Sequence, residues 1–202
     1  MNKHTTADDI SYQFLDTTGI RDRFLLQNLF SEGELQLTYT DLDRAIVGSA
    51  VPTVDALTLA AADALRADYF CERRELGVIN LGSSGTITVD GTTYDLGKKE
   101  CLYIGRGSKE ISFASASAGD PAQYYLLSYP AHADYPTTHA KIEDANLVEL
   151  GSQTTANERH LYQYIHEKGI QSCQLVMGFT EIKPGSTWNT MPPHTHDRRS
   201  EV

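Results

Sequence analysis

The sequence predicts an all-β protein, a sandwich or barrel of the jelly-roll kind. From residue 72 to residue 130, short apolar or alternating segments are separated by turn residues about every eight to twelve positions. Asp90-Gly91, between two alternating segments, is a strong signal for a β-hairpin. Many short strands joined by frequent turns are typical of sandwiches and barrels.

The elements before residue 72 carry weaker signals. Residues 16–19 contain capping side chains and precede a largely apolar stretch at 20–26. The two segments together predict a short capped helix. Residues 34–40 alternate polar and apolar side chains, as a half-buried strand does, and residues 44–52 indicate a further strand. The alanine-rich stretch at 57–67 predicts a short helix.

The remaining elements follow in order. Strands are expected at residues 76–81, 86–89, 92–96, 100–104, 110–113 and 123–129. Residues 131–156 are mixed and polar, which is typical of a connector. Residues 158–164 fit a strand or a short helix, and residues 174–182 fit a strand that ends at a Pro-Gly turn.

Composition limits the class of partner. The chain has 202 residues and a net charge of −10 without any lysine or arginine run, which argues against nucleic acid. The N-terminus has no apolar signal region, and the most apolar window, residues 56–65, is too short to span a bilayer. Three cysteines without a close pair indicate reduced thiols. We therefore expect a cytoplasmic protein with no membrane partner.

Two histidines and a carboxylate near the end of the chain form a candidate metal site. His194 and His196 are one residue apart, so on a strand their imidazoles would point to the same face. The connection to Glu201 is long enough for the chain to turn and bring its carboxylate beside them. Two neutral nitrogens and one anionic oxygen suit Zn, Fe, Mn, Ni or Cu. A polar surface turn is the alternative interpretation.

An internal similarity suggests a duplicated barrel. Residues 72–76 resemble residues 197–202, and superposing the two arginine pairs places Tyr69 and Cys71 where the second copy has its histidines. We therefore expect an N-terminal barrel without metal ligands at residues 1–150, and the start of a second, metal-binding barrel at residues 151–202.

Longer blocks carry a resemblance to a known family. The HxHxxxxE pattern from His194 to Glu201 resembles the first signature of the cupins. Residues 72–80, 85–91 and 188–199 are similar to the 5-keto-4-deoxyuronate isomerase family, also called 4-deoxy-L-threo-5-hexosulose-uronate ketol-isomerase. The similarity runs from about residue 17 to residue 202. It implies a double-barrel (bicupin) jelly roll that forms homohexamers and acts in pectin and uronate breakdown.

The resemblance also implies a cofactor and site residues. One zinc ion per subunit would be held by His194, His196, Glu201 and a fourth histidine beyond residue 202, although the donor set also suits other divalent metals. Arg198 and Arg199 are candidates for holding a substrate carboxylate, or else are solvated or ion-paired. Trp188 could line the pocket or pack in the core.

The implied reaction converts 5-dehydro-4-deoxy-D-glucuronate to 3-deoxy-D-glycero-2,5-hexodiulosonate through an enediol. The residues do not identify the catalytic base, so the catalytic residue is unknown. A non-catalytic cupin module that binds sugar acids is the alternative function. Residues 151–202 are too few to close a second barrel. We therefore expect a fragment or a barrel completed by another chain, with weak metal binding and little activity from residues 1–202 alone.

Four other histidines lack the spacing of ligands, and we expect each to be hydrogen-bonded or at the surface: His132, His139, His160 and His166.

Overall fold

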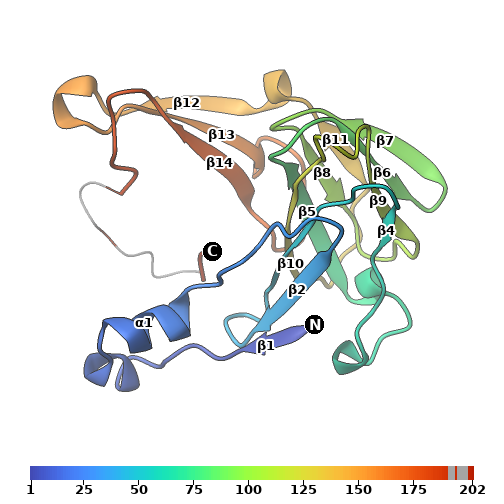
Figure 1. The fold of residues 1–202 in the computed structure, drawn as a ribbon, viewed down its shortest axis with the longest axis horizontal. Helices are drawn as coiled ribbons and strands as arrows, with labels where there is room; N and C mark the ends of the chain where they lie inside the picture. The colour runs from blue at the N-terminus through green and yellow to red at the C-terminus, as the bar shows by residue number, and fades with distance from the viewer. Residues whose placement is uncertain (191–193, 195–199) are drawn as a thin grey trace.

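The computed structural model describes residues 1–190, 194 and 200–202, and in this part of the chain strands form three sheets (Figure 1). A seven-stranded sheet has the spatial order β1-β2-β3-β10-β5-β8-β11, a four-stranded sheet the order β4-β9-β6-β7, and a three-stranded sheet the order β12-β13-β14. One α-helix, α1 (Thr17–Phe24), lies in the described part. The predicted all-β class is confirmed.

The strands have the following bounds. The seven-stranded sheet contains β1 (Asn2–His4), β2 (Leu35–Thr40), β3 (Ile46–Ala50), β10 (Tyr124–Pro130), β5 (Arg74–Asn80), β8 (Cys101–Ile104) and β11 (Thr138–Ala140). The four-stranded sheet contains β4 (Leu57–Thr58), β9 (Ile111–Ser115), β6 (Gly85–Val89) and β7 (Thr92–Leu96). The three-stranded sheet contains β12 (Asn146–Leu150), β13 (Arg159–Ile165) and β14 (Met177–Ile182). All pairings are antiparallel except that of β1 with β2.

The predicted hairpin and helix cap are both present. Asp90 and Gly91 have φ of 48° and 82° between β6 and β7, as a tight two-residue hairpin requires, and glycine adopts such angles without steric cost. Asp16 caps α1, because its side chain accepts a 2.7 Å hydrogen bond from the Gly19 amide.

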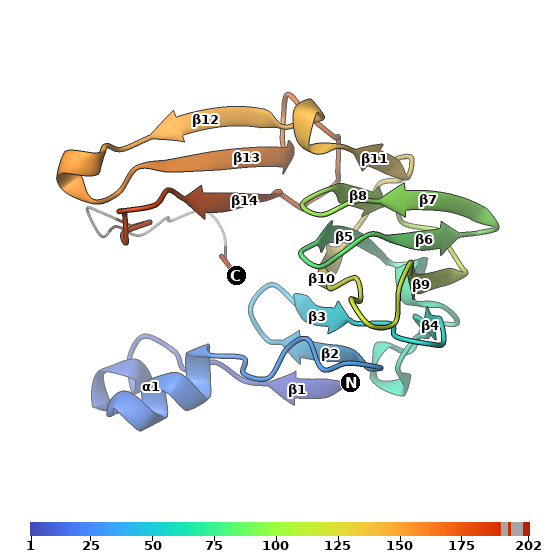
Figure 2. The ribbon, with the colours of Figure 1, turned by 45° about the horizontal axis from the view of Figure 1, so that its top comes forward.

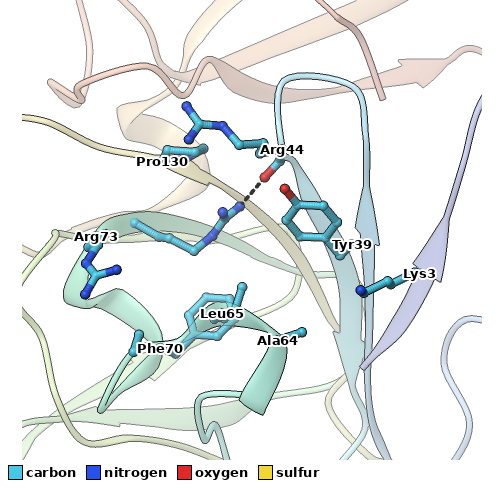
Figure 3. Close-up of a pocket in the computed structure, with 10 residues that line it drawn as sticks. Lys3, Tyr39, Arg44, Ala64, Leu65, Phe70, Arg73 and Pro130 are labelled. Atoms are coloured by element: carbon cyan, nitrogen blue, oxygen red, sulfur yellow. Dashed lines mark hydrogen bonds between the residues drawn. The ribbon is translucent and has the colours of Figure 1, made fainter.

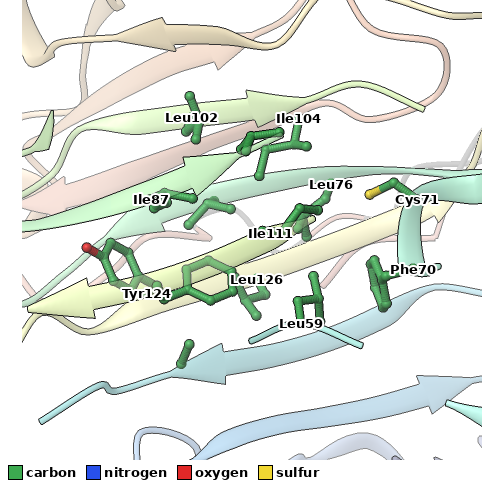
Figure 4. Close-up of a cluster of buried hydrophobic side chains, with 14 of the residues drawn as sticks. Leu59, Phe70, Cys71, Leu76, Ile87, Leu102, Ile104, Ile111, Tyr124 and Leu126 are labelled. Carbon is green, nitrogen blue, oxygen red and sulfur yellow. The ribbon is translucent and has the colours of Figure 1, made fainter. Parts of the chain in front are cut away.

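The first core lies between the seven-stranded and four-stranded sheets (Figure 4). Alternate residues of β6 and β9 point into it, among them Ile87 and Phe113, and they meet Leu126 and Tyr124 from β10. Tyr124 is fully buried, and its hydroxyl donates to the carbonyl of Ala114 at 3.0 Å. Two packed antiparallel sheets of this kind agree with the predicted sandwich.

The second core lies on the other face of the seven-stranded sheet. Cys101 and Tyr103 of β8 pack there against Tyr164, Ile165 and Met177 of the three-stranded sheet. The buried residues of β13 and β14 are confined to the end of one and the beginning of the other. The three-stranded sheet is therefore attached at one end and extends away from the sandwich, as Figure 2 shows.

Two sequence predictions were wrong. Residues 57–67 do not form a helix: they contain β4 and a 3₁₀ turn (Asp63–Leu65), because Leu59 is buried in the first core and its amide donates to the carbonyl of Ile111. Residues 131–156 are more than a connector, since they contain β11 and β12. Residues 158–164, for which strand and helix were both open, belong to strand β13.

None of the described helices has the length and apolar character needed to cross a membrane.

Candidate functional site

The segment that carries the predicted metal motif begins at a well-defined turn after β14. Gly185 has a φ of 87°, which glycine adopts readily. The amides of Thr187 and Trp188 both donate to the carbonyl of Ala156, at 2.9 and 3.1 Å. The chain leaving β14 is thus fixed beside the residues that precede β13.

The structure describes only part of the predicted site. His194 and Glu201 are exposed, and the amide of Ser200 donates to Oδ2 of Asp43 at 3.2 Å, which places residue 200 beside the β2–β3 turn. His196, Arg198 and Arg199 lie outside the described residues. The described part of the chain contains no group of three histidine, cysteine or acidic side chains that could hold a metal ion. The ligand set stays a prediction, and its chemistry, two imidazoles and a carboxylate, fits zinc.

Trp188 is not a core residue. Its side chain is 51% exposed, so it is free of the two hydrophobic cores and lies at the surface between β14 and the motif. This position is compatible with the predicted contact to a substrate, which stays a prediction.

The buried carboxylate of Glu75 holds residues 173–175, which lead into β14, through hydrogen bonds. Glu75 on β5 has no exposed surface, and its Oε2 accepts hydrogen bonds from the Tyr103 hydroxyl at 2.7 Å and the Cys173 amide at 2.8 Å. Its Oε1 accepts from the amides of Gln174 and Leu175, each at 2.6 Å. Four donors satisfy this anion, as a buried charge requires. Burial, followed by the hydrogen bond to Glu75, raises the pKa of Tyr103 well above its usual value.

The Glu75 anchor explains why β14 begins later than predicted. Residues 173–175 turn their amides toward Glu75 instead of toward a neighbouring strand, so pairing with β13 starts at Met177. Sequence reasoning missed this role. Its only signal was an acidic residue in β5, a strand that is buried along its whole length.

A second contact holds the three-stranded sheet in place. Lys99, in the turn between β7 and β8, forms a 2.6 Å ion pair with Glu181 and lies 5.8 Å from the ring centroid of Phe179. Phe179 stacks in turn on Tyr162, with ring centroids 4.6 Å apart. The hydrogen bond from Lys99 lowers the pKa of Glu181 below its usual value. The backbone carbonyl of Lys99 also accepts a hydrogen bond from the hydroxyl of Tyr164.

The four histidines that lack ligand spacing are dispersed. His139 contacts Glu100 at 2.8 Å, and His160 contacts Glu149 at 3.4 Å. His132 Nδ1 lies 3.2 Å from the sulfur of Cys173. The Nδ1 of His166 accepts a hydrogen bond from the Lys168 amide at 3.4 Å, as expected, whereas its Nε2 is buried without a hydrogen-bond partner among the described residues.

Comparison with known proteins places this chain among named enzymes. A 4-deoxy-L-threo-5-hexosulose-uronate ketol-isomerase from Lachnoclostridium phytofermentans is 51% identical over 202 residues, which is 100% of this chain and 73% of that protein. A protein of the same name from Formosa agariphila is 53% identical over 187 residues, 93% of this chain and 67% of that protein. An IolB-like protein from Salmonella typhimurium LT2 shares the fold with a TM-score of 0.50 at 10% identity, covering 63% of this chain and 47% of that one.

The family-level match is equally extensive. Residues 24–202 match the KduI/IolB family, which leaves residues 1–23, with β1 and all of α1 except Phe24, outside the match. With relatives about half identical across nearly all of its length, this chain belongs to the KduI/IolB family.

Proposed function

We propose that this chain is a metal-dependent ketol isomerase that converts 5-dehydro-4-deoxy-D-glucuronate to 3-deoxy-D-glycero-2,5-hexodiulosonate in pectin and uronate breakdown. The observation that carries the proposal is identity of about 50% with named ketol-isomerases along the whole chain. The reaction moves a carbonyl to the neighbouring carbon through an enediol, so it requires a proton to be shuttled between two carbons.

The metal ligands in this proposal are His194, His196 and Glu201. Zinc is the proposed ion, and it would supply Lewis-acid polarisation of the substrate oxygens. Glu201 is a ligand here, so the proton shuttle is assigned to another, unidentified group. Arg198 or Arg199 would hold the substrate carboxylate through a planar guanidinium fork, and Trp188 would cover one side of the sugar.

The architecture in this proposal is a bicupin. Residues 1–150 form the barrel without metal ligands, and residues 151–202 belong to the metal-binding barrel. The three-stranded sheet supports this division, since it is attached to the sandwich at one end only. A homohexamer is the proposed assembly.

Isomerase assays on the purified protein that carries this sequence test the metal requirement. Thorough chelation should abolish turnover, and added zinc should restore it, because the polarising ion is part of the proposed chemistry. His196→Ala should lower kcat/KM by about 100-fold or more, the scale on which loss of a group that stabilises the transition state is felt. His160→Ala, which removes an imidazole on β13, is the matched control and should retain activity.

Two outcomes would contradict parts of the proposal. Turnover that survives complete metal removal would exclude the metal requirement. Saturable binding of the keto-uronate without any conversion by the zinc-loaded protein would favour a non-catalytic sugar-acid module.

A further inference from the structure

We propose that the N-terminal half of this chain has its own binding site for a small organic anion, a carboxylate or a phosphate ester, at a cationic cavity whose described lining contains neither His194 nor Glu201. The end of the predicted metal motif lies nearby, because the Ser200 amide donates to Asp43, which precedes the lining residue Arg44. The cavity has a volume of about 330 Å³ and is bordered by β1, the β2–β3 hairpin and the segment from residue 64 to residue 74 (Figure 3). A volume of this order suits a small metabolite.

The charge around the cavity is opposite to that of the protein. Lys3, Arg44, Arg73 and Arg74 line it, and no acidic residue is among its described lining residues. The whole chain, in contrast, has a net charge of −10. Arg73 forms a 2.8 Å ion pair with the neighbouring Glu72, which partly balances its charge. The cationic side chains of Lys3, Arg44 and Arg74 create a local positive potential that attracts anions.

Arg74 is the central observation. It is only 6% exposed, and its Nε and Nη2 donate to neutral acceptors: the hydroxyl and carbonyl of Ser128 and the carbonyl of Arg44, at 2.7 to 3.1 Å. Within the described part of the chain, Nη1 has no hydrogen-bond partner and no carboxylate forms an ion pair with this guanidinium. A buried charge without a counter-charge is costly, and an anion in the cavity would supply one.

The lowered pKa of Arg74 agrees with the burial of its side chain. Burial disfavours the charged form of Arg74 and lowers its pKa to about 10, so the side chain is still a cation at neutral pH. An anionic ligand would therefore meet a fully charged, pre-positioned donor. Such preorganisation favours binding, because a side chain that is already fixed loses little conformational entropy when the ligand binds.

Part of the cavity lining is apolar. Leu65 and Phe70 also line the cavity, and Phe70 is buried in the first core (Figure 3). A wall of this kind fits the carbon skeleton of an organic ion better than a bare inorganic one. The combination of cationic and apolar lining residues defines the ligand class: a small acid whose charged end would contact Arg74.

Calorimetric titration with sodium D-glucuronate and with inorganic phosphate tests the proposal and separates a carboxylate from a phosphate source. Saturable binding of either probe is expected. Lys3→Glu and Arg73→Glu should each raise Kd about tenfold or more, since they reverse a charge at the cavity. Arg74→Lys keeps the charge but loses the planar fork, and should also weaken binding.

Two controls make the result specific. Arg66→Glu makes the same charge change on an exposed residue of the same segment that does not line the cavity, and should alter Kd less than about twofold. His196→Ala should leave binding unchanged, which separates this cavity from the proposed isomerase site. The proposal is overturned if neither probe binds below about 20 mM, if Arg66→Glu weakens binding as much as Arg73→Glu, or if His196→Ala abolishes it.

Discussion

At the scale of single residues, Glu75 shows what an ionised side chain needs in order to lie inside a hydrophobic core. All four of its hydrogen bonds come from neutral donors, three of them backbone amides of residues 173–175. The same amides would otherwise be unsatisfied, because they leave the pairing pattern of β14. The carboxylate and the loop therefore satisfy each other.

Replacing Glu75 with Gln should destabilise the protein by about 2–4 kcal/mol. The amide nitrogen of Gln cannot accept a hydrogen bond, so at least one buried backbone donor loses its partner. Urea unfolding at neutral pH measures the difference. Glu149→Gln is the control, because Glu149 is 76% exposed and its loss should change the free energy of unfolding by less than about 0.5 kcal/mol. Equal effects of the two variants would argue against the anchor.

Residues whose role is local were predictable from the sequence. Asp16 and the pair Asp90-Gly91 act on backbone groups within a few positions, so their side-chain chemistry alone indicates a cap and a hairpin. Glu75 and Arg74 act on residues that are far away in sequence, and no local pattern reveals such partners. The metal motif was found by spacing alone, and its geometry stays a prediction.

At the scale of elements, the three-stranded sheet depends on contacts from the turn between β7 and β8. Lys99 pairs with Glu181 on β14, and its backbone carbonyl accepts from Tyr164 on β13. One turn of the sandwich thus contacts two neighbouring strands of the attached sheet.

The Lys99 contact makes a pH-dependent contribution to stability. Because the folded-state pKa of Glu181 is lowered, this contribution is present above the ordinary glutamate pKa and is lost as the pH falls through the lowered value. Carbon-detected NMR titration of the Glu181 carboxyl should show this depressed pKa. Lys99→Met should return it toward the ordinary value.

Asp41 provides the internal reference for that titration. Its pKa is lowered by a hydrogen bond from the Thr6 amide, far from Lys99 in sequence, and should stay low in the Lys99→Met variant. An unchanged Glu181 titration in Lys99→Met would contradict the assigned cause.

Strands with an alternating or apolar pattern were predictable, whereas short edge elements were not. β4 has two residues and owes its conformation to pairing with β9, so its alanine-rich surroundings predicted the wrong structure. β12 has mostly exposed or half-buried residues and is recognisable only through its partner β13. In both cases tertiary pairing overrides local propensity.

At the scale of the whole molecule, the two cores share one sheet. Residues of the seven-stranded sheet alternate between the first core and the second, so neither core can be lost without disrupting the strands that support the other. We therefore expect both cores to unfold in a single cooperative step.

Cysteine labelling tests this cooperativity. Cys71 lies in the first core, where burial raises its pKa to about 12, and Cys101 lies in the second, where burial also raises its pKa. Iodoacetamide should therefore label the half-buried Cys173 in the folded protein but not these two thiols. In a urea series read by mass spectrometry, Cys71 and Cys101 should become reactive at the same midpoint. Separate midpoints would show that the cores unfold independently.

The position of β10 between β3 and β5 has a consequence for synthesis on the ribosome. β10 pairs with residues 46–50 on one side and 74–80 on the other, so the middle of the large sheet stays open until residue 130 has left the exit tunnel. The hydrogen bonds of Glu75 form later still, because its amide partners at residues 173–175 emerge after residue 130. Until then its carboxylate remains hydrated at the surface of a nascent sheet, and this charge would disfavour premature association of that face with other apolar chains.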